Sequence, residues 1–252
     1  MAGQAMGQTE ESAATPDFRP LYAQVKELIL RRMVAGVWGP GEALPSEQRL
    51  AQEFGVSQGT VRKALDEMAA QNQVVREQGR GTFAATHQNQ RAQFHFLHIL
   101  PDSGLKKMPT SRVVSLKQAP ATREQTERLR LAAGTPVTRI LRLRAIEGTP
   151  VILERIAVPT ALVPGLALPI GEEIAEELYV IYERRHGVVV ARAEEALKAV
   201  AADAVDARHL EIERGAPLLE VDRIARSLDG SPVEWRSSRC DTRHHHYFSV
   251  IE

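Results

Sequence analysis

The stretch LPSEQRLAQEFGVSQGTVRKALDEM (residues 44–68) contains two short amphipathic helices separated by a glycine. Ser46 is expected to cap the first helix and Ser57 the second, because a serine hydroxyl accepts a hydrogen bond from an unpaired amide at a helix start. Gly55 provides the left-handed residue that ends the first helix. Two helices joined by so short a turn predict a helix-turn-helix.

The residues on both sides of this pair complete a small domain. Apolar residues that include Leu28 and Met33 recur at helical spacing, which predicts a preceding helix at residues 21–36. Downstream, VVREQGRGTFAA (residues 74–85) predicts two short strands joined by a glycine-rich turn. Three helices followed by such a hairpin indicate a winged helix-turn-helix at residues 17–86.

The composition of the 252-residue chain excludes some classes of protein. It holds 32 basic and 32 acidic residues, so its net charge gives no general attraction to nucleic acid. Its one cysteine, Cys240, excludes an internal disulfide framework and fits a reducing compartment. No apolar run is long enough for a membrane span, and residues 1–16 lack the features of a signal peptide. We expect a disordered tail at residues 1–16 and a cytoplasmic protein.

A repeat organises the second half of the chain. LRLAAGTPVTRILRLRAIEGTPV (residues 129–151) parallels LEIERGAPLLEVDRIARSLDGSPV (residues 210–233), with an offset of 81 residues from Gly134 to Gly215. Each unit has a helical lead-in, a strand, a turn with an acidic residue and a glycine, and a return strand. The pattern predicts a pseudo-symmetric α+β domain around an antiparallel sheet. The expected layout is a linker at residues 87–110 with a possible strand at 94–100, the domain at 111–252, a helix at 172–186 and a strand at 188–200.

The helix-turn-helix predicts binding to double-stranded DNA. An α-helix fits the major groove, and the start of the second helix of the pair reads base edges there. Gln58 suits adenine, Arg62 suits guanine or a phosphate, and Arg80 at the hairpin tip suits the minor groove. Packing alone is the competing explanation, since many short-turn helix pairs serve no other purpose. DNA contacts are expected from Ser46, Gln48, Ser57, Gln58, Gly59, Thr60, Arg62, Lys63, Gly79, Arg80 and Gly81.

The same stretch, with the GRGTF that follows it, resembles the DNA-binding domain of GntR-family bacterial transcription regulators over residues 18–85. VTRILRLRAIEGTPVILERIAVP and GAPLLEVDRIARSLDGSPVE resemble the effector-sensing UTRA domain of the HutC subfamily over residues 112–250. The resemblance implies a homodimeric regulator, usually a repressor, that a small molecule releases from its operator, and a sensing domain with a fold similar to chorismate lyase. The family often has arginine at the positions of Gln48 and Gln58, which favours a different operator sequence.

Charged residues in alternation mark the expected sensing site. Arg142 and Arg144 lie two residues apart on a predicted strand, so both guanidinium groups face one side of the sheet. Two such groups make a fork for phosphate or carboxylate, which favours an anionic effector such as a sugar phosphate or an organic acid. Spacing alone favours a solvated, salt-bridged sheet face, and the resemblance reverses that preference, most clearly for Arg142 and Glu154. The resemblance implies effector contacts at Arg142, Arg144, Glu154 and Glu234, and Tyr179 and Arg192 are possible additions.

The stretch RCDTRHHHYF (residues 239–248) departs from the subfamily pattern, so the resemblance carries no pocket contact over to Cys240. Three adjacent histidines at residues 244–246 fit no familiar structural-zinc spacing. A strand edge with titratable side chains is the preferred interpretation, and neither a metal nor a cofactor is expected.

The main hypothesis is a ligand-responsive transcription regulator that binds a palindromic operator as a dimer. Two alternatives stay open. The C-terminal domain could be an enzyme that processes a small acid, although no activated nucleophile, metal set or glycine-rich phosphate loop is visible. The protein could instead be a constitutive DNA-binding protein whose C-terminal domain only dimerises.

Overall fold

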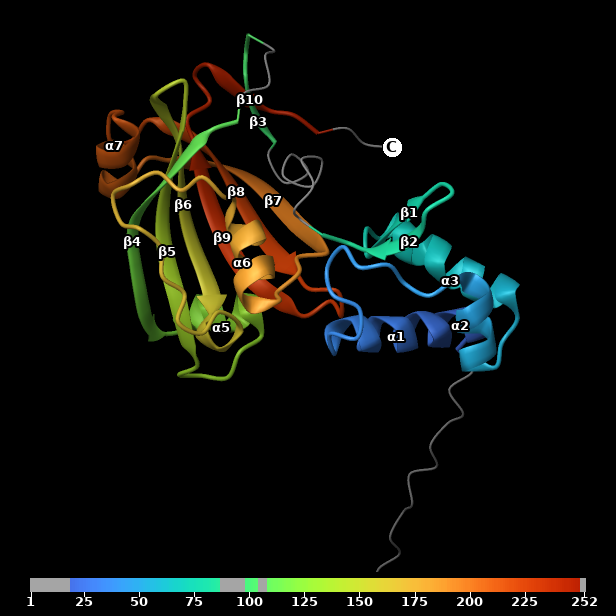
Figure 1. The fold of residues 1–252 in the computed structure, drawn as a ribbon. Coiled ribbons are helices and arrows are strands. Elements are labelled where there is room, and N and C mark those ends of the chain that lie inside the picture. The colour runs from blue at the N-terminus through green and yellow to red at the C-terminus, as the bar shows by residue number, and fades with distance from the viewer. Residues whose placement is uncertain (1–18, 87–97, 104–107, 250–252) are drawn as a thin grey trace, which may run out of the picture.

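The computed structural model describes residues 19–86, 98–103 and 108–249, which form two units (Figure 1). The smaller unit holds the helix-turn-helix, and the larger one surrounds a six-stranded sheet. The expected tail at residues 1–16 and most of the expected linker at residues 87–110 lie outside the described residues. Within the described residues, we find no helix with the length and apolar character that crossing a bilayer requires.

The small unit is a winged helix-turn-helix, as the sequence predicts. Its three helices pack together, and the two strands pair in an antiparallel hairpin. The elements are α1 (Leu21–Val34), α2 (Glu47–Phe54), α3 (Gln58–Ala70), β1 (Val74–Glu77) and β2 (Gly81–Ala84).

The helix ends in this unit confirm the predicted caps. Ser46 Oγ accepts a hydrogen bond from the amide of Arg49 at 3.3 Å, and Ser57 Oγ accepts one from the amide of Thr60 at 3.1 Å. Gly55 follows α2 in the left-handed region, with φ of +65°. Each serine satisfies an amide that has no partner within its helix, so local sequence sets where α2 and α3 begin.

The apolar core of the small unit follows the predicted periodicity with one exception. In α1 the buried residues Val25, Ile29 and Met33 are spaced by four, which puts them on one stripe. Leu28, which the helical spacing includes, lies outside this stripe and is 43% exposed. The apolar stripe of α3 is buried throughout, and its members are Val61, Ala64, Leu65 and Met68.

The large unit is built on an antiparallel sheet in the order β4-β5-β6-β9-β8-β7. The two hairpins that the sequence repeat predicts are β5–β6 and β8–β9, and they join along β6 and β9 at the centre of the sheet. The expected pseudo-symmetric antiparallel sheet is therefore confirmed. Its strands are β4 (Thr110–Pro120), β5 (Pro136–Ile146), β6 (Thr149–Pro159), β7 (Arg192–Ala201), β8 (Pro217–Arg226) and β9 (Pro232–Cys240).

Each half of the sheet repeats more structure than the sequence repeat indicates. An outer strand and a short helix precede each hairpin, namely β4 with α5 (Arg123–Leu129) and β7 with α7 (Ala204–Leu210). Both helices begin with a capping box and end at a left-handed residue, Arg130 or Glu211. Apolar residues of α5 and α7 pack on the same face of the sheet.

The opposite face is covered by α6 (Leu178–His186) and the segment that precedes it (Figure 1). The helix expected at residues 172–186 therefore starts late. The reason is that the amides of Gly171 and Ile174 donate to carbonyls of β4, each at 2.8 Å, which holds this segment in a non-helical conformation along the sheet edge. The strand expected at residues 188–200 is β7, which begins later, at Arg192, and ends at Ala201.

A short two-stranded ribbon lies beside the sheet. It pairs β3 (Ile99–Pro101) with β10 (His245–Tyr247). β3 falls inside the stretch expected to be a linker, and residues 94–97 of the possible strand lie outside the described residues. The ribbon brings the C-terminal histidine run next to a segment from the centre of the chain.

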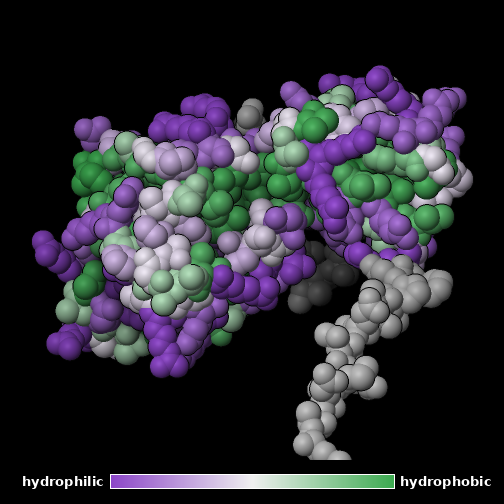
Figure 2. Space-filling view, turned by 90° about the horizontal axis from the view of Figure 1, so that it is seen from below, coloured by the Kyte–Doolittle hydropathy of each residue, from purple (hydrophilic) through white to green (hydrophobic). Residues whose placement is uncertain are grey.

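The two units touch at the end of the sheet that holds the β8–β9 turn and the start of β7. The Gln73 side-chain amide donates to the carbonyl of Leu228 at 3.1 Å, and Val189 joins the apolar core of the small unit. An apolar groove of about 1020 Å³ lies between the units, lined by residues of both, among them Trp38 from the small unit and Leu131 from the large one. Figure 2 shows hydrophobic side chains gathered between the two lobes.

Candidate DNA interface and candidate ligand site

The start of α3 presents a polar surface that Glu47 organises. The Arg62 guanidinium donates to Glu47 Oε2 at 2.9 Å, and the Gln58 amide donates to the same oxygen at 3.3 Å. The hydrogen bond from Arg62, together with its charge, lowers the pKa of Glu47 despite some burial. A carboxylate on α2 thus holds two predicted base-reading side chains of α3 in one place, a role that no sequence pattern indicated.

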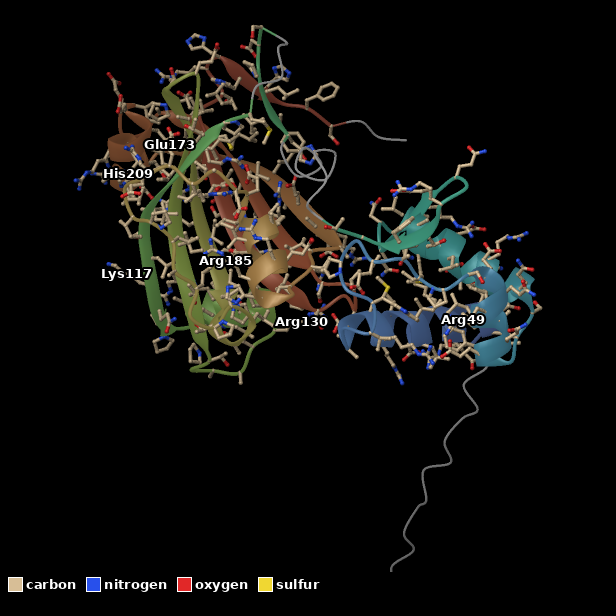
Figure 3. The ribbon with its side chains drawn as sticks, viewed as in Figure 1. Arg49, Lys117, Arg130, Glu173, Arg185 and His209 are labelled. Carbon is tan, nitrogen blue, oxygen red and sulfur yellow. The ribbon has the colours of Figure 1, made fainter. Side chains whose placement is uncertain are left out.

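Arg76 on β1 extends the same network, because it pairs with both Glu47 and Asp66. Two carboxylates therefore lie among the basic side chains of this surface, and the interface is less basic than the number of arginines suggests. Arg49 on α2 is exposed, on the side of the small unit that is remote from the sheet (Figure 3).

Lys63 takes a different direction from its neighbours. Its ammonium group lies 4.0 Å from the centroid of the Tyr22 ring on α1, a cation–π contact that holds the side chain against its own domain. The structure therefore does not bring Lys63 together with Gln58 and Arg62. Two successive helical residues point about 100° apart, which is why Arg62 and Lys63 separate although they are adjacent.

The hairpin tip is open and carries one arginine. Gly79 and Gly81 have φ angles of +74° and +122°, conformations that side chains rarely adopt, so the turn requires glycine at both positions. Arg80 between them is exposed, pairs with Glu77 and lies 5.5 Å from the Phe83 ring centroid.

The remaining predicted DNA contacts lie on or beside α2 and α3. Ser46, Gln48, Ser57 and Gly59 are exposed, and Thr60 is half-buried with its hydroxyl bonded to Ser57 Oγ at 2.8 Å.

The predicted sensing residues lie on the sheet face that α6 covers. Arg142 on β5 stands opposite Glu154 on β6, and residues directly opposite each other point to the same face. Alternation along β5 puts Arg144 on this face as well. All three side chains are buried, so the solvent-exposed sheet face that spacing alone favours is wrong, although the side chains do form ion pairs.

Arg142 and Arg144 share a carboxylate that the sequence pattern did not indicate. Arg142 Nε donates to Glu154 Oε2 at 2.5 Å and Nη1 donates to Glu177 Oε2 at 3.4 Å. Arg144 Nη2 donates to Glu177 Oε1 at 2.5 Å. Burial by itself would raise the pKa of Glu177, but the charges of Arg144 and Arg142 lower it by more. The net shift is therefore downward, and the carboxylate stays ionised.

Glu234 lies at the centre of a second set of contacts. Arg236 donates to both of its oxygens, at 2.9 and 3.0 Å, and to Glu154 Oε1 at 3.1 Å. The hydroxyls of Tyr179 and Tyr182 on α6 donate to the same two oxygens, each at 3.0 Å. Burial and the nearby carboxylate raise the pKa of Tyr179 to about 12, so it remains a donor.

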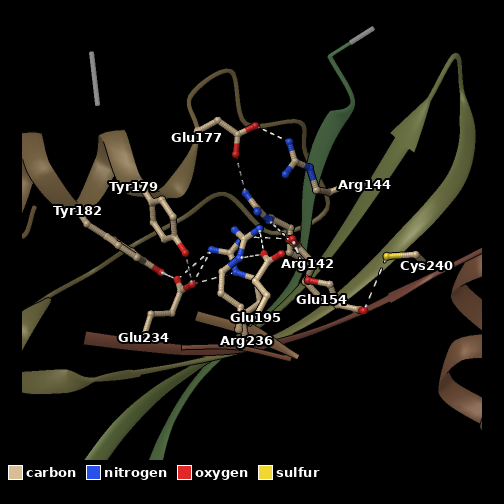
Figure 4. Close-up of polar contacts among 12 residues, drawn as sticks. Arg142, Arg144, Glu154, Glu177, Tyr179, Tyr182, Glu195, Glu234, Arg236 and Cys240 are labelled. Carbon is tan, nitrogen blue, oxygen red and sulfur yellow. Dashed lines mark hydrogen bonds and ion pairs between the residues drawn. The ribbon is translucent and has the colours of Figure 1, made fainter. Parts of the chain in front are cut away.

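A third pair completes what we call the arginine–glutamate cluster (Figure 4). Arg223 Nε on β8 donates to Glu195 Oε1 at 2.5 Å, and Tyr247 of the ribbon donates to Glu195 Oε2 at 2.5 Å. The cluster contains equal numbers of both charges, so it is close to neutral. Its members are Arg142, Arg144, Arg223 and Arg236 with Glu154, Glu177, Glu195 and Glu234.

Sequence signals existed for some of the additional members. Arg236 lies two residues after Glu234 on one strand, so it shares its face, and Arg223 lies one repeat offset of 81 residues after Arg142. Glu177 had no such signal, because it precedes a helix and reaches the strands through the tertiary fold. Arg192, a possible addition, is 64% exposed, pairs with Glu194 and stays outside the cluster.

The candidate ligand site is nearly closed. A cavity of about 30 Å³ lies beside the cluster, against Arg144, Glu154 and the buried Cys240. Burial raises the pKa of Cys240, so this cysteine stays a thiol. Two buried donors in the cluster, Arg142 Nη2 and Arg144 Nε, have no hydrogen-bond acceptor among the described residues. Buried donors without partners are uncommon and mark a place where an acceptor would bind favourably.

The histidine run does not form a recognisable metal site. His246 Nδ1 lies 2.9 Å from Asp102 Oδ1 across the ribbon, and the carbonyl of His244 accepts from the amide of Asp102 at 3.0 Å. In the part of the chain that the structure describes, no group of three or more histidine, cysteine, aspartate or glutamate side chains is arranged to hold a metal ion.

Two family models match the chain, one over the small unit and one over most of the large unit. The family model for bacterial regulatory proteins of the gntR family matches residues 21–84, and that for the UTRA domain matches residues 104–246. The histidine utilization repressor of Pseudomonas putida is 30% identical over 205 residues, which cover 81% of each chain.

Two solved structures give the same result for the fold. The ligand-binding domain of a protein from Bordetella bronchiseptica, described as a GntR-family transcriptional regulator, is 32% identical with a TM-score of 0.58, and the match covers 63% of this chain and 98% of that one. The possible transcriptional regulator YydK of Bacillus subtilis has a TM-score of 0.55 at 20% identity, covering 93% and 100%. The second match shows that the whole two-unit fold occurs elsewhere.

Proposed function

Because the chain belongs to the GntR family of bacterial regulatory proteins and carries a UTRA domain, we propose that it is a repressor that a small anionic metabolite releases from DNA. The repressor assignment is supported by the name of the Pseudomonas putida relative. The observation that carries the ligand assignment is the pair of buried donors on Arg142 and Arg144 that lack acceptors among the described residues. A phosphate or carboxylate group offers oxygens to such donors.

The proposed DNA contact uses α3 in the major groove and Arg80 in the minor groove. Gln58 and Arg62, held by Glu47, offer donors in a fixed arrangement that suits purine edges. The protein acts as a homodimer in this proposal, with two recognition helices about 34 Å apart on a palindromic operator. Effector binding releases the DNA when it changes that spacing. A difference of a few kcal/mol between the effector's binding free energies for the DNA-bound and the released form is enough for this.

The two alternatives have less support. The Pseudomonas, Bordetella and Bacillus relatives are regulators by description, and none of these three is described as an enzyme. A constitutive DNA-binding protein would not need buried arginines with unsatisfied donors in its second domain.

Arg144→Gln tests the ligand site. We expect operator binding to be unchanged and the effector concentration for half-release to rise at least about tenfold, because one charge-assisted hydrogen bond contributes about 1.5–3 kcal/mol. A panel of sugar phosphates and organic acids, screened by operator-release assays, supplies the effector. Arg144 is preferred to Arg142, whose loss would strip a buried partner from Glu154 as well as from Glu177.

Arg139→Gln is the matched control, since Arg139 lies on the same strand but faces the other side, where it donates to the carbonyl of Pro120 at 2.7 Å. Normal release of the Arg144→Gln protein by every active compound would refute the proposed site.

Arg80→Ala tests the wing. We expect weaker DNA binding and a smaller salt dependence, because the slope of log K against log salt decreases by about 0.9 for each phosphate that the protein no longer neutralises. Fluorescence anisotropy at several salt concentrations measures this slope. Arg123→Ala, an exposed arginine on α5, is the control. A slope equal to that of the unaltered protein would mean that the wing makes no ionic contact with DNA.

A further inference from the structure

The arginine–glutamate cluster must open before it can bind a metabolite. Ligand sites usually have volumes of about 300–1,000 Å³, whereas the cavity beside Arg144 and Glu154 has about 30 Å³. Its four arginines already contact glutamates, so an anionic ligand has to replace one of these carboxylates or add charge to a neutral buried cluster. Adding an uncompensated charge to a buried site is costly, which favours replacement.

Glu177 is the carboxylate that can leave most easily. Glu154 and Glu234 project from central strands, are fully buried and are each held by several donors. Glu177 lies outside the sheet, immediately before α6, and its side chain is 22% exposed. It makes no capping bond to the helix, because its carboxylate reaches the arginines instead. Its departure breaks two contacts and disturbs no strand.

The fit of Glu177 to the two arginines is incomplete. Its two oxygens accept from Arg144 Nη2 at 2.5 Å and from Arg142 Nη1 at 3.4 Å, the latter a long hydrogen bond. Arg142 Nη2 and Arg144 Nε are left without acceptors among the described residues. A phosphoryl group has three terminal oxygens and a larger charge, so it can satisfy donors that a carboxylate leaves unused.

We propose that Glu177 is an internal competitor, whose carboxylate occupies the place on Arg142 and Arg144 that the phosphoryl group of the effector takes. This inference rests on the proposed function and adds the residue that the effector must displace. Binding is then an exchange of one anion for another, which adds less charge to the buried cluster than binding without displacement of Glu177 would. The exchange also selects effectors by their charge, since weakly charged metabolites cannot displace the carboxylate.

The exchange acts on α6, a helix of the large unit that also contacts the small unit. Glu177 precedes α6, and Tyr179 and Tyr182 on that helix bond Glu234. Further along α6, Glu183 accepts a hydrogen bond from Thr86 at 2.5 Å, and Val189 after the helix joins the core of the winged helix. Release of Glu177 therefore removes one of the contacts that hold the start of a helix whose other end contacts the winged helix-turn-helix unit.

Glu177→Gln tests the exchange with inorganic phosphate as the probe. We expect the variant to bind phosphate about tenfold more tightly than the unaltered protein, because glutamine removes the competing charge while keeping a similar shape. Calorimetric titration at constant ionic strength gives the affinities, and the phosphate concentration that half-releases the operator should fall by a similar factor. Glu177→Asp keeps the charge on a shorter side chain, and we expect an intermediate affinity.

Glu176→Gln is the matched control, because it removes the same charge one residue away, where Glu176 pairs with Arg184 near the surface. It should leave phosphate affinity unchanged, and adding Arg144→Gln to Glu177→Gln should abolish the gain. Equal affinities of the Glu177→Gln and unaltered proteins, or weaker binding by the variant, would overturn the exchange. If Arg144→Gln still blunts release by an active metabolite, the proposed function survives that result; if it does not, both fail.

Discussion

Arg62→Ala is expected to abolish sequence-specific operator binding while the protein stays folded. Arg62 is 57% exposed at the start of α3, and its contacts there are to Glu47 on the protein surface. A bidentate contact between arginine and guanine contributes about 1–3 kcal/mol of discrimination in each half-site. In the proposed homodimer, two half-sites double this loss, which removes most of the preference for operator over random DNA.

The measurement is a competition between labelled operator and unlabelled random duplex at moderate ionic strength. Lys63→Ala is the matched control, because Lys63 lies one position along α3 but contacts the Tyr22 ring. That variant should lose little specificity. If Arg62→Ala retained full preference for the operator, Arg62 would have to be removed from the base-reading residues.

Arg236→Met is expected to give the largest loss of stability. All three nitrogens of this buried guanidinium donate to carboxylates, two bonds going to Glu234 and one to Glu154. Methionine has a similar volume but no charge, so two buried carboxylates lose a partner. Removing one member of a buried ion pair costs about 3–5 kcal/mol, a large part of the stability of a typical domain.

Urea unfolding followed by circular dichroism measures this loss. Arg192→Met is the matched control, since Arg192 pairs with Glu194 at the exposed surface, where an ion pair contributes about 0–1 kcal/mol. Combining Arg236→Met with Glu234→Gln should recover part of the stability, because one of the stranded charges is then removed. Similar losses for Arg236→Met and Arg192→Met would mean that the cluster is not held together by its charges.

Much of the fold could be predicted because its signals are local. Ser46, Ser57 and Gly55 mark helix ends through bonds within a few residues, and Gly79 and Gly81 allow the positive φ angles of the wing. The repeat predicted two hairpins and their pseudo-symmetry. Strand alternation also put Arg142 and Arg144 on one face of the sheet, as the structure has them.

The candidate site was harder to predict because its partners come from distant segments. The sequence by itself determined which residues share a face of each strand, since the alternation of side chains along a strand fixes that direction. Tertiary structure alone decided that Glu177 meets Arg142 and Arg144, that α6 buries the charged face, and that Lys63 rests on Tyr22. Those contacts depend on how elements pack across the chain, and burial by a covering helix turns a row of surface charges into a closed, balanced cluster.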